Sequence, residues 1–181
     1  GGVGTAGDLN GDGYSDVLVG APLYDDGAKV DAGMVWAFLG SSTGPSSTPA
    51  WSIVGDQAGA QLGYGLGTAG DVNGDGYADF LASAPRYDNG QTDEGRVYLY
   101  LGSATGPVVS PAWIGEPDKA STAYGSAVHT LGDLNRDGFA DVVIGGPEWD
   151  GDSLNNAGKV WVYLGSAAGL AGAAAWTTDS G

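Results

Sequence analysis

One acidic segment occurs three times in this chain at a nearly constant spacing, and this repeat limits the possible fold more than any other feature. The copies begin at Asp8, Asp71 and Asp133, which are 63 and 62 residues apart. After each copy come an apolar run that ends near a proline, a second apolar run, a turn that ends in glycine, and a tryptophan. A long period that recurs this regularly indicates a repeat architecture, in which each repeat is one supersecondary unit. The chain therefore contains three copies of one unit.

Each repeat contains four short segments with strand character. The first is rich in small residues, as in 65–69, and glycine in a strand often marks a close approach of two backbones. The second and third are nearly continuous runs of Val, Leu, Ile and aromatic residues, as expected for strands covered on both faces. The fourth carries the tryptophan, which is Trp51, Trp113 or Trp176. No segment has a convincing helical period, so we predict an all-β fold.

Four-stranded units at a fixed period are typical of β-propeller blades. We therefore predict three four-stranded antiparallel sheets, with blades at residues 1–63, 64–124 and 125–181. Closed propellers have about 4–8 blades, so three blades would leave two apolar faces exposed. We expect the chain to hold whole blades that are either part of a parent propeller or completed by identical copies. Two copies closing a six-bladed ring through a two-fold dimer is the favoured arrangement.

The charge of the chain excludes several classes of partner. It carries 22 acidic and 6 basic residues, for a net charge of −16, and such a chain is repelled by nucleic acid and by anionic lipid. No apolar run approaches the length needed to span a membrane, so we expect no membrane insertion. There is no cysteine, which removes disulfides and thiolate metal sites.

The acidic segment has the pattern Asp-x-Asn-x-Asp-Gly-x-x-Asp, which is typical of a metal-binding turn. Its alternating side chains can converge on one point, and the glycine after the third ligand permits a sharp turn. Ligands that are all oxygen, several of them charged, suit Ca²⁺ before Mg²⁺. We predict three Ca²⁺ sites. Their ligands are Asp8, Asn10, Asp12, the Tyr14 carbonyl and Asp16; Asp71, Asn73, Asp75, the Tyr77 carbonyl and Asp79; and Asp133, Asn135, Asp137, the Phe139 carbonyl and Asp141.

Two other interpretations of these turns compete with the calcium site. An EF-hand needs flanking helices and a glutamate at the twelfth loop position, where this chain has Val19, Ala82 and Ile144. The second alternative is an acidic turn that caps its own backbone through Asx-type hydrogen bonds and binds no metal. Because all four side-chain ligands recur in all three turns, the calcium interpretation is favoured over this one.

The residues around the acidic turns resemble the FG-GAP repeat of integrin α-subunit propellers. Tyr64-Gly65 precedes the second turn and Ala84-Pro85 follows it, and the third copy has Tyr124-Gly125 before its turn and 145–147 after it. The resemblance extends over essentially the whole chain. It implies an extracellular or cell-surface location, a seven-bladed ring, and calcium loops on the face opposite the usual ligand face. Gly1 stands where a Tyr is expected, and Ser83 interrupts the second Gly-Ala-Pro.

Two motifs of enzymes occur by coincidence. Residues 40–44 match the nucleophile elbow and residues 65–70 match the dinucleotide fingerprint, but neither has the strand-to-helix context that its chemistry needs. The only histidine, His129, corresponds to glycine in the other repeats, which favours a surface or channel-facing role. We therefore predict that the chain is not an enzyme.

A ligand surface is expected on the loops that follow each proline, since these are long and variable and open with an aromatic residue and an aspartate. Exposed aromatics beside carboxylates suit sugar stacking or protein contacts, although an aromatic in register in every blade can also pack against its neighbour. The function expected is a calcium-binding scaffold for a protein or glycan. The alternative is a purely structural or accessory module of a larger secreted protein or enzyme. The candidate contact residues are Tyr24, Asp25, Tyr87, Asp88, Trp149 and Asp150.

Overall fold

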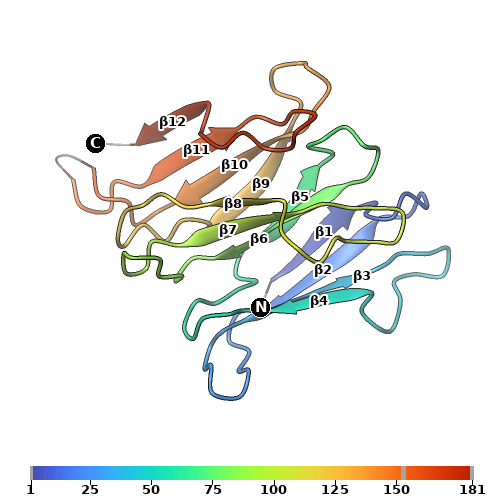
Figure 1. Cartoon of the computed structure of the whole chain (residues 1–181), viewed down its shortest axis with the longest axis horizontal. Coiled ribbons are helices and arrows are strands. Elements are labelled where there is room, and N and C mark those ends of the chain that lie inside the picture. The colour runs from blue at the N-terminus through green and yellow to red at the C-terminus, as the bar shows by residue number, and fades with distance from the viewer. Residues whose placement is uncertain (1, 152–153, 180–181) are drawn as a thin grey trace.

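The computed structural model describes residues 2–151 and 154–179, and its regular structure is made of β-strands (Figure 1). The strands are β1 (Val3–Gly7), β2 (Asp16–Ala21), β3 (Met34–Phe38), β4 (Trp51–Val54), β5 (Leu66–Gly70), β6 (Asp79–Ala84), β7 (Arg96–Tyr100), β8 (Trp113–Gly115), β9 (Ala127–Gly132), β10 (Asp141–Gly146), β11 (Lys159–Tyr163) and β12 (Trp176–Asp179).

The strands form three separate antiparallel sheets of four strands each, and within each sheet the spatial order follows the sequence. The orders are β1-β2-β3-β4, β5-β6-β7-β8 and β9-β10-β11-β12. The innermost strand of the first sheet ends in a bulge between Thr5 and Gly7, where Gly7 has a positive φ of 78°. A bulge locally increases twist and redirects the strand end. Each sheet is one meander, and we call the three sheets blades 1, 2 and 3.

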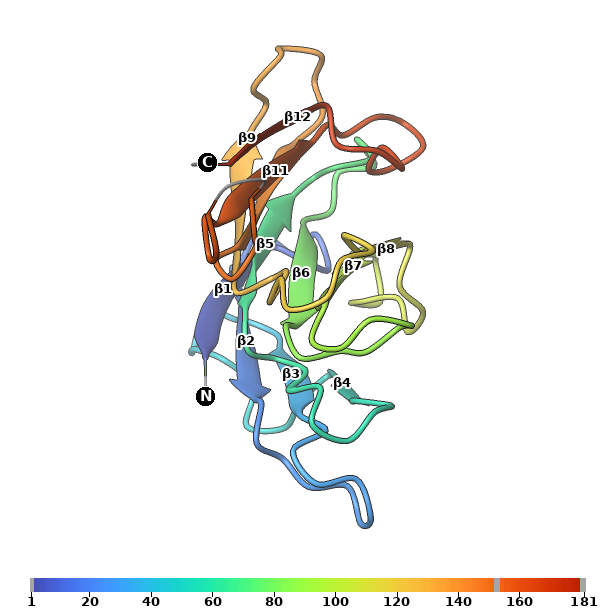
Figure 2. The same ribbon diagram turned by 90° about the vertical axis from the view of Figure 1, so that its left-hand side faces the viewer.

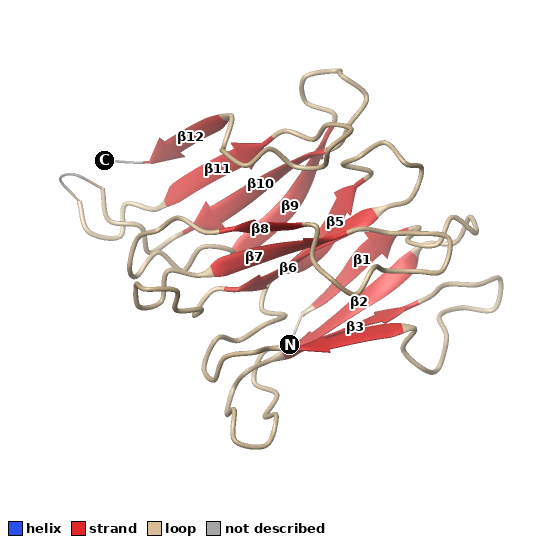
Figure 3. Cartoon of the chain, in the orientation of Figure 1, coloured by secondary structure: helices blue, strands red, loops and turns tan. Residues whose placement is uncertain are grey.

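The blades lie side by side with their first strands at the centre. Strand β1 packs against β5, and β5 packs against β9 (Figure 2). No helix occurs in the part of the chain that the structure describes (Figure 3). The predicted all-β fold of three four-stranded propeller blades is therefore confirmed, and the three blades form an open row and not a closed ring.

The hydrophobic core lies between neighbouring blades and not within any one of them. Trp51 of β4 packs edge-on against Phe80 and Tyr100 of blade 2, with ring centroids 5.4 and 4.9 Å apart. In the same way Trp113 of β8 packs against Tyr163 of blade 3 at 4.9 Å. One blade alone is a thin sheet that cannot bury its apolar face, so stacking supplies the core.

The short segment that connects one blade to the next packs against the preceding blade. We call residues 59–63 the first strap and residues 121–125 the second strap. In the first strap, the N–H of Leu62 donates to the carbonyl of Ala32 at 3.0 Å, and in the second the N–H of Tyr124 donates to the carbonyl of Glu94 at 3.1 Å. Both straps therefore bind their blade through main-chain hydrogen bonds.

Candidate metal centres in the acidic loops

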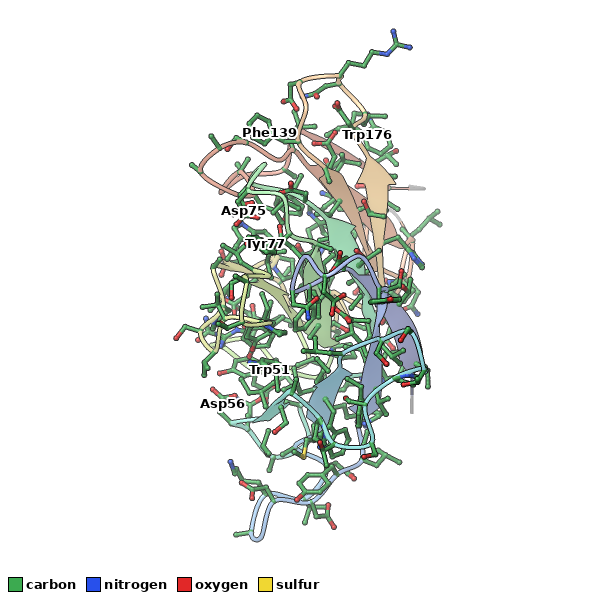
Figure 4. The ribbon with its side chains drawn as sticks, turned by 90° about the vertical axis from the view of Figure 1, so that its right-hand side faces the viewer. Trp51, Asp56, Asp75, Tyr77, Phe139 and Trp176 are labelled. Carbon is green, nitrogen blue, oxygen red and sulfur yellow. The ribbon has the colours of Figure 1, made fainter. Side chains whose placement is uncertain are left out.

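The three acidic turns connect the first and second strands of their blades, and consecutive turns contact each other. The N–H of Ala78 in the second turn donates to the carbonyl of Asp8 in the first at 2.9 Å, and Ala140 donates to Asp71 at 2.9 Å. Figure 4 shows Asp75 and Tyr77 beside each other in the second turn, on the same side of the molecule as Phe139. The repeat thus places all three predicted sites along one side of the row of blades, with one site in each blade.

The first aspartate of each turn holds the turn's own backbone. In the first turn, Asp8 Oδ1 accepts the N–H groups of Gly11 and Asp12 at 2.7 and 3.1 Å, and Oδ2 accepts that of Gly13 at 2.7 Å. The second turn repeats these bonds on Asp71 at 2.7, 3.1 and 2.8 Å. The turn therefore closes around one carboxylate.

The two predicted ligands in the middle of each turn are hydrogen-bonded to each other. Asn10 donates its amide to Asp12 Oδ2 at 2.9 Å, and Asp12 Oδ1 accepts the N–H of Tyr14 at 2.9 Å. The pair Asn73 and Asp75 repeats the first bond at 2.9 Å, and in the third turn Asn135 donates to Asp137 at 2.8 Å.

The last aspartate of each turn is buried at the base of the blade, where it joins two segments. Asp79 is fully buried and accepts the N–H of Val72 at 2.9 Å and the N–H of Gly102 at 2.9 Å. Asp16 binds Leu9 and Gly40 in the same way, and Asp141 binds Leu134 and Gly165. This carboxylate therefore ties the acidic turn to the end of the third strand.

The acidic turns concentrate negative charge in a partly desolvated place. Burial raises the pKa of Asp79 to about 7; the N–H donors of Gly102 and Val72 lower it, and the carboxylates of Asp75 and Asp71 raise it further. Burial likewise raises the pKa of Asp16, which is opposed by the bonds from Gly40 and Leu9 and reinforced by Asp12 and Asp8. A bound cation would favour the charged form of these groups.

The donor set fits a hard cation in its chemistry, because each turn offers carboxylate, amide and carbonyl oxygens only. Across residues 2–151 and 154–179, however, no three His, Cys, Asp or Glu side chains are arranged as ligands of one metal ion. The carboxylates face backbone N–H groups, as in the self-capped turn. Since an ionised carboxylate has about four lone-pair positions, and Asp16 uses two of its own, capping leaves oxygen lone pairs for a cation.

The third turn differs from the first two. Arg136 stands where they have Gly11 and Gly74, and it adopts a positive φ of 63°, which is costly for a residue with a Cβ. The turn is also more exposed: Leu134 is 60% exposed, whereas the equivalent Leu9 is fully buried.

The aromatic–aspartate pairs of the expected ligand surface have structural partners. Asp25 accepts the N–H of Asp31 at 2.8 Å, and Asp88 and Asp150 close their loops in the same way. The guanidinium of Arg96 lies over the Tyr87 ring, 3.7 Å from its centroid. The ammonium nitrogens of Lys119 and Lys159 lie 4.0 and 4.2 Å from the centroid of the Trp149 ring. Tyr24 packs edge-on against Trp36 and is 39% exposed.

The serine of the elbow-like motif also has a structural partner. The Ser41 hydroxyl donates to the carbonyl of Gly44 at 2.7 Å, in the turn between β3 and β4.

Three structural features were not predicted from the sequence. The residue after the first aspartate carries the contact to the next blade: Ser103 donates to the carbonyl of Leu9 at 2.9 Å. Arg86 joins blade 2 to blade 3 through Glu148 at 3.3 Å. Glu94 is fully buried, and its Oε1 has no hydrogen-bond partner among the described residues. The contact between blades could have been found from the apolar residue that follows the first aspartate in every turn, which is Leu9, Val72 or Leu134. Glu94 stands where the other two repeats have alanine, and no pattern in the sequence pointed to it.

Comparison with known proteins decides the family. The model of the FG-GAP repeat matches residues 1–38, 62–100 and 124–163. The chain belongs to the FG-GAP repeat family. Among its relatives are integrin alpha-PS2 of Drosophila melanogaster, 34% identical over 76% of this chain, and integrin alpha-IIb of Mus musculus, 34% identical over 86%. Integrin alpha-7 of Homo sapiens is 38% identical over 67%. The resemblance inferred from the motifs is confirmed.

The FG-GAP chain spans a small part of these relatives. It aligns with 11% of integrin alpha-PS2, 15% of integrin alpha-IIb and 10% of integrin alpha-7. The described residues include no helix of the length and apolarity that crossing a bilayer requires.

Proposed function

We propose that this FG-GAP chain is a calcium-stabilised, non-catalytic propeller scaffold that works outside the cell or on its surface. The observation that carries the proposal is the threefold repetition of an oxygen-rich turn whose last carboxylate is buried at the base of the blade. The ligands proposed are the fifteen residues predicted from the sequence. The extracellular location rests on the similarity to integrin α chains.

Calcium would neutralise the negative charge of the clustered carboxylates in each turn. The first two turns illustrate the arrangement. Asp8 and Asp71 would hold it from one side of the turn, and Asp16 and Asp79 from the base. Because ligands that bind only the folded state stabilise it by mass action, the residues that close each turn would be held more firmly against the start of the second strand.

Calorimetry and thermal unfolding test the calcium proposal. We expect calcium to raise the melting temperature, excess chelator to lower it again, and titration calorimetry to give three sites per chain. Asp75→Asn should remove one site, and Asp88→Asn, outside the turns, should remove none. A melting curve that does not move between chelator and millimolar calcium would refute the calcium part of the proposal.

The partner face is proposed to be the loops after each proline, with a protein or glycan as ligand. Tyr24, Tyr87 and Trp149 would provide ring surfaces, and the aspartates that follow them would position the loops. A glycan array and a pull-down with Tyr24→Ala and Trp149→Ala test this part. If the array is blank and the variants capture the same proteins as the parent, the loop face has no ligand role.

The incomplete row of blades supports a proposal about assembly. Trp176 is 54% exposed at one end and Val3 is 75% exposed at the other. Two copies closing a six-bladed ring would cover both ends, and sedimentation should then show a discrete dimer. A monomer at every concentration would instead favour the second candidate, an accessory module of a larger secreted protein or enzyme; the small share of each relative that the chain covers favours that candidate too.

A further inference from the structure

Three asparagine–glycine pairs occur in the chain, at residues 10–11, 73–74 and 89–90. Asparagine is one of the residues that degrade chemically in proteins, and a glycine after it leaves its backbone nitrogen accessible because glycine has no Cβ. In this reaction the backbone nitrogen of the glycine attacks the side-chain amide carbon of the asparagine. Whether a pair reacts therefore depends on whether the glycine nitrogen is free.

In the first two pairs the glycine nitrogen is held by a carboxylate of the acidic turn. The N–H of Gly11 donates to Asp8 Oδ1 at 2.7 Å, and the N–H of Gly74 donates to Asp71 Oδ1 at 2.7 Å. In both turns the side-chain carbonyl of the asparagine also accepts a backbone N–H, at 3.2 and 3.1 Å. Attack by either glycine nitrogen would therefore break hydrogen bonds that close the turn.

The third pair lies in the loop between β6 and β7, and its glycine nitrogen is free. Asn89 and Gly90 are both exposed. Within residues 2–151 and 154–179, no atom accepts a hydrogen bond from the N–H of Gly90. A Cβ placed on Gly90 would meet nothing within 4 Å. Neither a hydrogen bond nor a neighbouring group thus holds this nitrogen back.

The amide nitrogen that would leave is held alike in the three pairs. In each pair it donates to a nearby carboxylate, at 2.9, 2.9 and 3.0 Å. For Asn89 the acceptor is Oε2 of Glu116. The pairs therefore differ at the glycine N–H and at the asparagine carbonyl, and not at the leaving group.

We propose that Asn89 is a site of spontaneous conversion to aspartate and isoaspartate, and that the acidic turns protect Asn10 and Asn73 from the same reaction. The nitrogen of Gly90 loses its proton to solvent and forms a bond to Cγ of Asn89. The bond from Cγ to the amide nitrogen breaks, and ammonia leaves with a proton from solvent. Water then opens the cyclic imide at either of its carbonyl carbons. The net reaction consumes one water and releases one ammonia.

The product would place a new negative charge in the loop that carries Tyr87. Aspartate is ionised at neutral pH, so Glu116 would face a carboxylate where it now accepts a donor, and like charges repel each other. Glu116 also accepts a hydrogen bond from Arg96, whose guanidinium lies over the Tyr87 ring. Conversion should therefore loosen residues 86–93. The modification depends neither on calcium nor on a partner of the loop face.

Peptide mapping by mass spectrometry, after incubation at mildly alkaline pH, tests the proposal. The full chain is kept in excess chelator, so that a bound cation cannot protect the acidic turns. We expect the peptide with Asn89 to gain the mass difference between an amide and an acid at least about tenfold faster than the peptides with Asn10 and Asn73, equivalent to about 1.4 kcal/mol in activation free energy. Enzymatic methylation of isoaspartate should label the same peptide.

Unfolding supplies the matched control. In concentrated guanidinium chloride the three pairs should convert at comparable rates, because the hydrogen bonds that protect Asn10 and Asn73 are lost. Asn89→Gln should remove the fast reaction and leave the other two peptides unchanged. The proposal is overturned if Asn89 in the folded chain converts no faster than Asn10 and Asn73. It is also overturned if Asn89 keeps the same lead in the unfolded chain, since the fold would then have no part in the selectivity.

Two variants isolate the effect of the new charge. Asn89→Asp carries the charge of the product, and Asn89→Gln keeps an amide at the same position. We expect faster amide hydrogen exchange over residues 86–93 in Asn89→Asp than in Asn89→Gln. Equal exchange in the two variants would refute the loosening of the loop.

Discussion

The interface between blades 1 and 2 and the open face of blade 3 are built from equivalent residues that have opposite environments. Trp51 is 7% exposed and Leu9 is fully buried, whereas Trp176 is 54% exposed and Leu134 is 60% exposed. Because the repeats share their pattern, the difference comes from the neighbour: blade 2 covers Trp51 and Leu9, and no described residue covers Trp176 in that way. Stability in this fold is thus a property of pairs of blades, as in other repeat proteins.

The largest effect is expected when Trp51 and Trp176, which begin the last strands of blades 1 and 3, are each replaced by alanine. Trp51→Ala should lower the free energy of unfolding by about 3–5 kcal/mol, because it leaves a cavity against Phe80 and Tyr100. Trp176→Ala should change it by less than about 0.5 kcal/mol in the monomer, because that ring has little to lose. Urea unfolding at a concentration where sedimentation shows one chain measures both. Equal losses would mean that the open face is already covered.

A second comparison uses the residue that follows the first aspartate of each turn. Leu9→Ala should cost about 2–5 kcal/mol, since the side chain is buried in the core shared with blade 2. Leu134→Ala should cost less than about 0.5 kcal/mol. Chemical unfolding of both variants, followed by tryptophan fluorescence, checks the pair. If Leu134→Ala were the more harmful, the third turn would have a contact that the exposed side chain does not reveal.

A third comparison adds one methyl group to equivalent glycines. Gly20→Ala should destabilise by about 1–3 kcal/mol, because its Cβ would lie 2.1 Å from the carbonyl oxygen of Gly63 in the first strap and overpacking forces the backbone to shift. Gly145→Ala should be neutral or should stabilise by up to about 1 kcal/mol, because glycine inside a strand is unfavourable when nothing requires it. Thermal unfolding of the two variants distinguishes these signs. A stabilised Gly20→Ala would show that the first strap does not pack against Gly20.

The smallest effect is the pH dependence of the covered interface. Burial raises the pKa of Tyr98 to about 12 and also raises that of Tyr100. A pKa above its unfolded value gives stability that is complete below pH about 10 and is lost as pH rises toward 12. Urea unfolding at pH 9 and pH 11 should therefore show lower stability at pH 11. Tyr100→Phe, which keeps the ring, should lose less; an unchanged dependence would exclude Tyr100 as a contributor.

Much of the fold follows from local patterns that the sequence displays directly. The apolar runs before Pro22, Pro85 and Pro147 became β2, β6 and β10, and the acidic turns lie between the first two strands of every blade. The positive φ angles of Gly13, Gly76 and Gly138 accord with the expected sharp turn. These features depend on residues close together in the chain, so a repeated pattern is enough to predict them.

Other features could not be predicted because they depend on residues far apart in the sequence. Asp79 is buried because Val72 and Gly102 converge on it, and Gly102 lies just after β7, 23 residues further along the chain. The straps have positive φ at Gln61, Ser121 and Ala123, residue types that give no local warning of it. The three calcium sites and the loop-face ligand contacts remain predictions.

The sequence by itself determined the number of blades, the order of their strands and the position of every acidic turn, because these follow from short-range periodicity and turn chemistry. Only the tertiary structure decided which copies of a repeated residue are buried. Burial depends on the neighbouring blade, and equivalent residues such as Leu9 and Leu134 have the same side chain but different neighbours.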